Sequence, residues 1–179
     1  MTTYRLIFFY ALFFTFWLFL INAPAQFRES TDENRSKSKN VQLEEKTAKL
    51  ENLVFQLTNK SRAENGLPRL EWSEKAAQAA QLHSNNMAAE NFFSHIGLDG
   101  QRVDRRLDSV GIKNWLGVAE NIALNAGYDD PARQAVNAWM KSPSHRGNLL
   151  NSRWQETGIG ISVAKNGTFY FTQVFVQKY

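Results

Sequence analysis

The sequence predicts an α+β fold in which helices cover both faces of a small antiparallel sheet, a three-layer α-β-α sandwich. After Gly158 the spacing of the apolar residues changes from helical to alternating. In the segment 168–177, TFYFTQVFVQ, three phenylalanines fall on one face, and Tyr170, Val174 and Val176 fall on the other. A strand that is apolar on both faces must be covered on both faces. The helical segments that precede it in the chain can provide this cover.

The first 25 residues are predicted to be a secretory signal peptide or an uncleaved signal anchor. The run LIFFYALFFTFWLFLI contains sixteen residues without a charge and follows a single arginine. The pattern Ala-Pro-Ala at 23–25 is typical of a cleavage site. The run is slightly shorter than a bilayer-spanning helix of about 20 residues, so both interpretations stay open. Either way, the rest of the chain is predicted to be secreted or held at the cell surface or in the periplasm, with membrane contact only through this segment.

Residues 26–40 are predicted to be a polar, solvated linker, because QFRESTDENRSKSKN contains one aromatic and no aliphatic residue. A helical lead-in is predicted for residues 41–51, where leucines return near helical spacing. Gly66 followed by Pro68 marks the end of this helix. The compact domain is predicted to span residues 52–179. The chain contains no cysteine, so burial alone must stabilise this domain, which about 130 residues can achieve.

Each later helix has a recognisable start or end. Ser73 can cap a helix whose apolar face includes His83, which predicts a hydrogen-bonded core histidine. Gly111 ends a short helix within QRVDRRLDSVG. Asp130 and Pro131 can open a further helix. The segments GIGISVA and TFYFTQVFVQ are joined by KNG, which predicts a β-hairpin with Asn-Gly at its turn.

The composition argues against several classes of function. The 21 basic and 17 acidic residues are interspersed, and no basic stripe with interleaved aromatic residues is visible, so nucleic acid is not an expected partner. The chain has no cysteine nucleophile, and it lacks the H-E-x-x-H, G-x-S-x-G and glycine-rich phosphate-binding motifs. Enzymatic activity is therefore left undecided by these motifs.

Two of the three histidines lie in loop-like segments, His95 in FFSHIGLDG and His145 in KSPSHRGNLLNS. The best acidic candidate is Glu120 in GVAENIALN, because an unpaired carboxylate is costly to bury in an apolar segment. We expect Glu120 to lie within hydrogen-bonding or bridging distance of both histidine rings. Two imidazoles and one carboxylate can bind zinc or another divalent cation, and they can equally form a hydrogen-bonded network without metal.

The ordered motifs FFSH, AEN, AWMKSPSHRGNLLN, TGIG and FTQVF resemble the bacterial branch of the CAP superfamily, also called the SCP domain. That family groups cysteine-rich secretory proteins, antigen 5 and plant pathogenesis-related proteins. The resemblance covers about Leu53 to Tyr179 and implies an α-β-α sandwich. It also implies a cleft with two histidines and two acidic residues, often able to bind a divalent cation. His95, Glu120 and His145 match three of these four positions.

The chain departs from the family pattern at two positions. Ala119 stands where glycine is common, and the second acidic residue is expected near Ser142. We therefore expect at most three protein ligands for a metal. By the same resemblance, the supporting positions are His83, Asn121, Arg146 and Asn148.

The resemblance implies an exported binding module for an apolar, lipid, sterol-like or cell-envelope ligand. The alternative is a metal-assisted or histidine-based hydrolase with a protease-like activity. In that mechanism His95 or His145 activates water and Glu120 orients an imidazole. A third interpretation is that the histidine–glutamate network only braces the cleft. The missing nucleophile and the missing second acid favour the binding module.

Overall fold

The computed structural model describes the backbone of residues 25–179 and, within its helices and strands, the side chains from residue 33 onward. The chain divides into two units, Met1–Glu44 and Glu45–Tyr179. The predicted signal peptide or anchor lies outside the described residues, apart from Ala25. Among residues 25–179, no helix is both long and apolar enough to cross a membrane.

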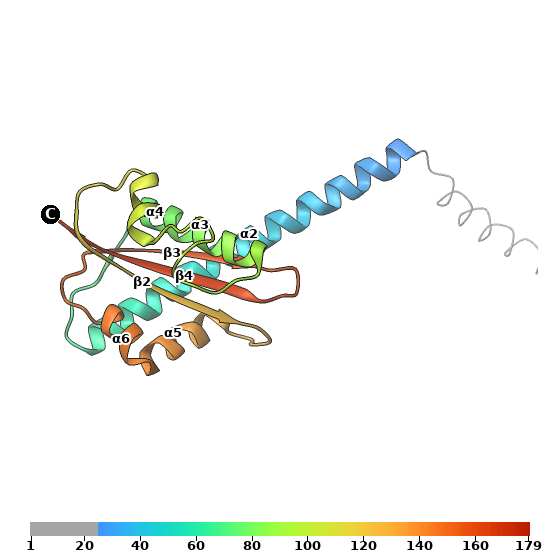
Figure 1. The fold of residues 1–179 in the computed structure, drawn as a ribbon. Helices are drawn as coiled ribbons and strands as arrows, with labels where there is room; N and C mark the ends of the chain where they lie inside the picture. The colour runs from blue at the N-terminus through green and yellow to red at the C-terminus, as the bar shows by residue number, and fades with distance from the viewer. Residues whose placement is uncertain (1–24) are drawn as a thin grey trace, which may run out of the picture. The chain divides into compact units, whose positions relative to one another are not determined.

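The second unit contains a four-stranded sheet with helices on both faces (Figure 1). The strands lie in the order β1-β3-β4-β2, which places β2 at one edge. The helices of the described chain are α2 (Ala25–Glu64), α3 (Glu74–Glu90), α4 (Val103–Ser109), α5 (Pro131–Lys141) and α6 (Pro143–Leu149). The strands are β1 (Glu71–Trp72), β2 (Trp115–Asn125), β3 (Glu156–Val163) and β4 (Phe169–Lys178).

The sheet is mixed, which corrects the prediction of a purely antiparallel sheet. β2 and β3 both pair antiparallel with β4, and β3 and β4 form the predicted hairpin. The additional strand β1 pairs parallel with β3 through Glu71 and Trp72. Two residues are too few to produce an alternating pattern, so the sequence offered no periodicity by which to find this strand.

The predicted linker at 26–40 is helical, because α2 is one continuous helix of 40 residues. The polar composition predicted a solvated linker. Side chains 33–46 are all exposed, as that composition predicts, but exposure does not prevent helix formation. Glutamate, lysine, arginine and glutamine all have good intrinsic helix propensity. α2 ends near the predicted position, and Gly66 takes the left-handed conformation there with φ of 70°.

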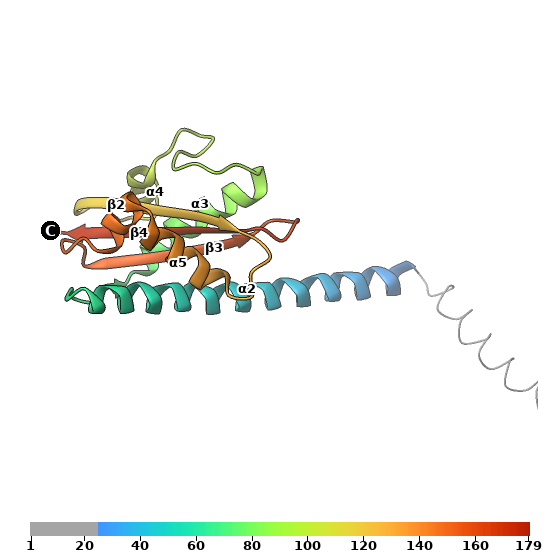
Figure 2. The same ribbon diagram turned by 90° about the horizontal axis from the view of Figure 1, so that it is seen from below.

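Two apolar cores lie on opposite faces of the sheet. Figure 2 shows the helices that cover these two faces. On one face, Val54 of α2 and Trp139 of α5 pack with Phe171 and Phe175 of β4. On the other face, the alanines of α3 and Leu107 of α4 pack with Val174 and Val176. The central strand β4 is therefore apolar on both sides and covered on both sides. This confirms the predicted three-layer sandwich.

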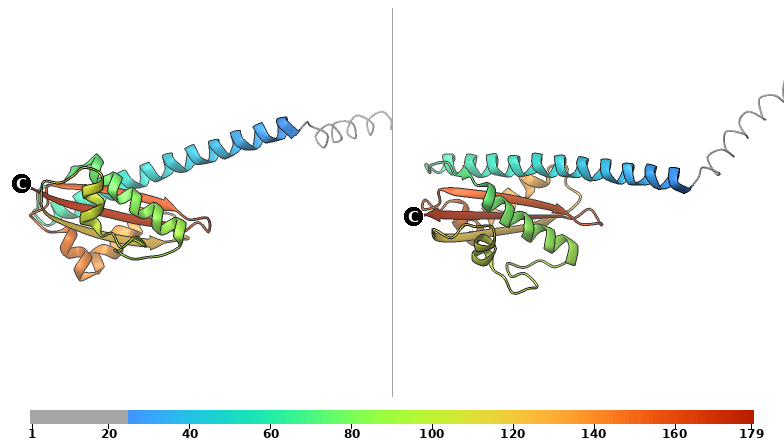
Figure 3. Two further views of the ribbon diagram at one scale, coloured as in Figure 1. Left: turned by 45° about the horizontal axis from the view of Figure 1, so that its top comes forward. Right: turned by 90° about the horizontal axis from the view of Figure 1, so that it is seen from above.

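Helix α3 crosses directly over β3 and β4 (Figure 3). Two glycines of β3 allow this close approach. A Cβ atom added to Gly158 would lie 2.0 Å from the backbone nitrogen of Ala77, and one added to Gly160 would lie 2.2 Å from that of Gln81. The side chain of Gln81 also hydrogen-bonds both the N–H and the carbonyl of Ile161. The contact fixes the position of α3, which bears His83.

Candidate functional site

The three candidate residues come from three elements around the edge strand β2. Glu120 lies in β2 opposite Val174, on the face that α3 and α4 cover. His95 lies in the loop between α3 and α4. His145 lies in α6, which corrects the prediction of a loop, because Pro143 begins a new helix rather than only following the previous one. Since β2 is an edge strand, residues from both helical layers can approach each other around it.

The carboxylate of Glu120 is buried and has two side-chain partners. Oε1 lies 2.8 Å from Nδ1 of His95, and Oε2 lies 2.5 Å from Nη2 of Arg106. The side chains of Glu120 and Arg106 are 3% and 6% exposed, whereas that of His95 is 50% exposed. Burial of a carboxylate is tolerated here because a guanidinium and an imidazole offset its desolvation.

The contact with Glu120 determines which nitrogen of His95 carries the proton. A carboxylate bonded to a guanidinium is a hydrogen-bond acceptor, so Nδ1 of His95 must donate to it. In the neutral ring, Nε2 then has the lone pair. Because half of this side chain is exposed, the site offers a hydrogen-bond acceptor or base at its surface.

The prediction that Glu120 lies within hydrogen-bonding or bridging distance of both rings is confirmed for His95, whereas no hydrogen bond joins Glu120 to His145 among the described residues. Nδ1 of His145 is hydrogen-bonded instead to Oγ of Ser142, at 2.8 Å. Burial, followed by the positive charge of His95, lowers the pKa of His145 below its ordinary value. His145 is therefore a neutral imidazole near neutral pH, and it lies close enough to His95 to sense its charge.

The side chains of Glu120 and His145 already have hydrogen-bond partners that bear on metal binding. Within the part of the chain that the structure describes, no group of three or more His, Cys, Asp or Glu side chains is arranged to hold a metal ion. Both oxygens of Glu120 bond other side chains, and Nδ1 of His145 bonds Ser142. A metal that used Glu120 as a direct ligand would have to share an oxygen with one of these donors and would lie beside the guanidinium of Arg106.

Two of the predicted supporting residues connect α6 to β2. Nδ2 of Asn121 donates to the carbonyl of His145, at 3.0 Å. Nδ2 of Asn148 donates to Oδ1 of Asn121, at 2.9 Å, and to the carbonyl of Glu120, at 3.3 Å. Arg146 differs from them, because its side chain is exposed and makes no hydrogen bond or ion pair seen among the described residues. The two asparagines thus fix His145 relative to Glu120.

His83 is a buried core histidine, as the sequence predicts. Nε2 lies 2.8 Å from the carbonyl oxygen of Ser94, so this nitrogen must carry the proton. Its ring packs edge-on against Phe92, and the side chain is fully buried. Burial is the main cause of its lowered pKa. His83 therefore anchors the residue directly before His95.

Arg106 is the site residue that the sequence analysis missed. It lies in α4, within the segment whose apolar residues Val103, Leu107 and Val110 predict a short helix. Arg106 is three residues after Val103 and four before Val110, so it lies at the border of the same buried face. The neighbouring Arg105 lies outside this spacing and is 73% exposed. This position relative to the apolar stripe was the signal that could have identified Arg106.

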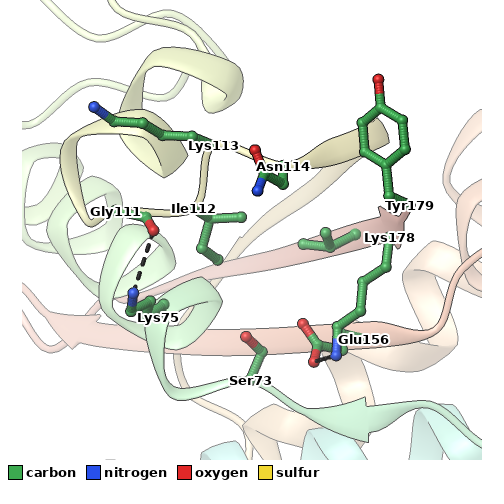
Figure 4. Close-up of a pocket in the computed structure, with 10 residues that line it drawn as sticks. Ser73, Lys75, Gly111, Ile112, Lys113, Asn114, Glu156, Lys178 and Tyr179 are labelled. Carbon is green, nitrogen blue, oxygen red and sulfur yellow. Dashed lines mark hydrogen bonds and ion pairs between the residues drawn. The ribbon is translucent and has the colours of Figure 1, made fainter.

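A pocket of about 540 Å³ lies elsewhere, near the start of α3 (Figure 4). None of the candidate residues lines it. Two of its three lysines already have partners, because Lys75 donates to the carbonyl of Gly111 and Lys178 pairs with Glu156. Lys113 points away from the other two (Figure 4). The pocket therefore lacks a converging set of charged groups.

An α-β-α sandwich with His95, Glu120 and His145 around the free edge of its sheet is the arrangement expected of an SCP domain. The chain belongs to this family: residues 55–179 match the family model for CAP, the cysteine-rich secretory protein family.

The chain is also similar to individual proteins of this family. It is 36% identical to the uncharacterized membrane protein YlbC of Bacillus subtilis, over 72% of this chain and 35% of that protein. It is 33% identical to YkwD of the same organism, over 87% of this chain and 55% of that protein. An extracellular protein of Bacillus anthracis that contains an SCP domain matches 74% of this chain and 41% of its own, with 31% identity and a TM-score of 0.65. The chain thus spans about a third to a half of these proteins.

Proposed function

We propose that this domain is an exported binding module for an amphipathic lipid of the cell envelope. The main support is the loop between α3 and α4, in which three large apolar side chains near His95 in the sequence are exposed. Phe93, Ile96 and Leu98 remain 47%, 46% and 72% exposed. Large apolar side chains that gather on the surface beside a polar group are typical of an interaction site. They suit the apolar part of a ligand.

The polar part of the ligand would bind His95. With Nδ1 donating to Glu120, the Nε2 atom of the neutral ring accepts a hydrogen bond. A hydroxyl or amide N–H of a lipid head group supplies such a donor. Ligand sites commonly combine a large apolar surface with a few polar groups that fix orientation. The apolar loop and His95 together offer this combination.

The relatives and the N-terminal segment support an exported location. One similar protein is named extracellular and another is named a membrane protein. The first 25 residues have the composition of a signal peptide or anchor. Secretion or display at the cell surface would bring the domain next to envelope lipids.

Co-sedimentation with vesicles of phosphatidylethanolamine and phosphatidylglycerol tests the proposal. A chain beginning at Ala25 is used, so that the apolar N-terminal run does not bind the vesicles by itself. Changing Phe93, Ile96 and Leu98 together to serine should weaken partitioning at least tenfold. The matched control changes Leu116 and Tyr128, which are 53% and 52% exposed outside this loop, to serine and should alter it less than twofold. Absence of vesicle binding by the parent chain would refute the lipid proposal.

A histidine-based hydrolase is the second candidate function, and the contact between His95 and Glu120 favours it. A carboxylate that orients an imidazole and leaves Nε2 available is an arrangement that can activate water as a general base. Peptide and ester substrates should then be cleaved, and the His95→Ala variant should lose the activity by at least a hundredfold. The Leu116→Ser variant serves as the control. Equal rates for parent and His95→Ala would exclude this candidate.

A further inference from the structure

The guanidinium of Arg106 places a positive charge next to the carboxylate of Glu120. Arg106 comes from α4 and Glu120 from β2, and their side chains are almost completely buried. Nη2 of Arg106 lies 2.5 Å from Oε2 of Glu120. A guanidinium is always protonated in proteins and donates in a fixed planar geometry. It therefore provides a permanent charge at the place where a metal bound to this carboxylate would provide one.

Arg106 is held in this position by further contacts. Nη1 donates to the carbonyl of Gln101, at 2.8 Å, and Nη2 lies 3.4 Å from the carbonyl of His95. These acceptors belong to the loop that bears His95. The guanidinium thus joins the loop, α4 and β2, and moving it aside would remove the donor of these two carbonyls and of Oε2 of the buried carboxylate.

The same contacts leave Glu120 poorly placed to bind a cation. Oε1 accepts from the imidazole and Oε2 accepts from the guanidinium. A divalent cation on either oxygen would have to use the second lone pair of an atom that already accepts a hydrogen bond, and it would lie beside a buried positive charge. The two available imidazole nitrogens alone would give at most two protein ligands, fewer than the three that open zinc sites ordinarily use.

We propose that Arg106 supplies the positive charge of this site and that the site is arranged without a divalent cation. Glu120 is then a positioning residue for His95 rather than a metal ligand. Arg106 keeps the carboxylate as an acceptor, and the carboxylate keeps His95 in the tautomer with the proton on Nδ1. The lone pair of Nε2 then faces outward. This inference does not depend on which ligand the domain binds.

Zinc titration by calorimetry tests the role of Glu120 with the metal alone as the probe. In the parent protein, Glu120→Gln should change zinc affinity less than threefold. If zinc binding is too weak to measure, it should be so for both the parent protein and the Glu120→Gln variant. In an Arg106→Gln background, Glu120 loses its charged partner and keeps only His95, and zinc affinity should rise at least tenfold. Adding Glu120→Gln to that background should abolish the rise. Arg105→Gln, which alters the exposed neighbour, should leave zinc affinity unchanged. A loss above threefold on Glu120→Gln in the parent protein would overturn the proposal.

The tautomer of His95 gives a second, independent measurement. The nitrogen chemical shifts of its ring should show the proton on Nδ1 in the parent protein. Arg106→Lys retains the charge and should retain this tautomer, whereas Arg106→Gln should shift the population toward the other one. Folding of each variant is checked by the dispersion of its amide spectrum. If Arg106→Gln folds but leaves both the tautomer and the zinc affinity unchanged, Arg106 has only a packing role and the proposal fails.

Discussion

Arg106 and Glu120 form a buried ion pair that connects helix α4 to the edge strand β2. Their side chains are 6% and 3% exposed, and the carboxylate has a second partner in His95. Buried ion pairs do not generally stabilise a fold more than apolar residues of similar size would. Removal of one partner, however, leaves the other charge buried and uncompensated. Replacing either residue should therefore change both the stability of the fold and the position of His95.

Arg106→Met should lower the free energy of unfolding by about 3 kcal/mol, because it removes the guanidinium and leaves the carboxylate of Glu120 buried beside a single imidazole. Urea denaturation followed by tryptophan fluorescence measures the change. The matched control is Arg105→Met in the same helix. Arg105 is 73% exposed and lies 3.9 Å from Asp108, so its loss should cost less than about 0.5 kcal/mol.

The double variant Arg106→Met, Glu120→Gln shows whether Arg106→Met destabilises the fold by breaking the ion pair or by removing the packing of the arginine side chain. If an unpaired charge is the cause, the second change should recover at least about 1 kcal/mol, since it removes that charge. Two destabilisations that simply add would show that packing of the arginine side chain explains the first result.

The glycines at the crossing of α3 and β3 should be the least tolerant of substitution. A Cβ at Gly158 would lie 2.0 Å from the nitrogen of Ala77 and 2.3 Å from the carbonyl carbon of Ala76. Both are backbone atoms, which can move only if the helix shifts. Gly158→Ala should therefore lower the free energy of unfolding by about 3 kcal/mol or more. A melting temperature close to that of the parent would show that α3 lies further from the sheet.

Gly147→Ala is the control for this steric effect. Gly147 lies in α6, and an added Cβ would meet nothing within 4 Å. Alanine restricts the unfolded chain and favours the helix, so this variant should be more stable by about 0.5–1 kcal/mol. If Gly158→Ala lowers the free energy of unfolding and Gly147→Ala raises it, the loss at Gly158 comes from the close approach of the α3 backbone and not from replacing glycine in general.

The fold was predictable from the sequence because its main signals are local. The alternating apolar pattern of β4 appears in TFYFTQVFVQ, and Asp130 stands where α5 starts, whereas Ser73 occupies the N-cap position of α3 without a side-chain capping bond. The side chain of Asp130 accepts from the backbone of Arg133, as a cap should. By contrast, β1 pairs for only two residues and depends on a contact with β3 that lies far along the chain. No local pattern reports such a pairing.

The candidate site was predictable in part, for a different reason. Glu120 stands out because it is a single acid in an apolar segment. A carboxylate that is buried there needs a hydrogen-bond donor or a positive charge as its partner. The sequence does not say which partner is nearest in space. His95 and Arg106 reach Glu120 from a loop and a helix whose positions depend on packing. His145 lies beyond the strand edge and bonds Ser142 instead. Tertiary packing, rather than residue type, decided between these partners.

The compact domain should not require residues 1–44. The second unit begins at Glu45, and side chains 33–44 are all exposed. A chain beginning at Glu45 should unfold cooperatively, with a melting temperature within about 3 °C of one beginning at Ala25. A chain beginning at Thr58 lacks the fully buried Val54 and should be destabilised by at least about 2 kcal/mol, the usual cost of losing such a core side chain. Calorimetry that finds equal stability for all three chains would contradict the assignment of Val54 to the core.

Glu51 should make the stability of the domain depend on pH in the range 4.5 to 7. It lies on α2, partly buried, and accepts a hydrogen bond from the backbone of Ile161 at 3.2 Å. Burial, and to a smaller extent the nearby Glu74, raise its pKa from 4.5 to about 7 in the folded protein. Between these two values the folded state binds more protons than the unfolded state, so stability falls as pH rises and is constant above about 7. Each pKa unit corresponds to about 1.4 kcal/mol, and since the carboxylate is partly solvated we expect a total loss of about 1–2 kcal/mol.

Glu51→Gln removes this ionisation and keeps an acceptor for the N–H of Ile161. At pH 8 the variant should be more stable than the parent by about 1–2 kcal/mol, and at pH 4.5 the two should agree within about 0.5 kcal/mol. Chemical denaturation at both pH values measures the difference, which cancels the contributions of other titrating groups such as His83. Glu45→Gln, on the same helix and exposed, should show no such pH dependence. A Glu51→Gln variant that is less stable than the parent at pH 8 would mean that the ionised carboxylate stabilises the contact between α2 and β3, contrary to the desolvation argument.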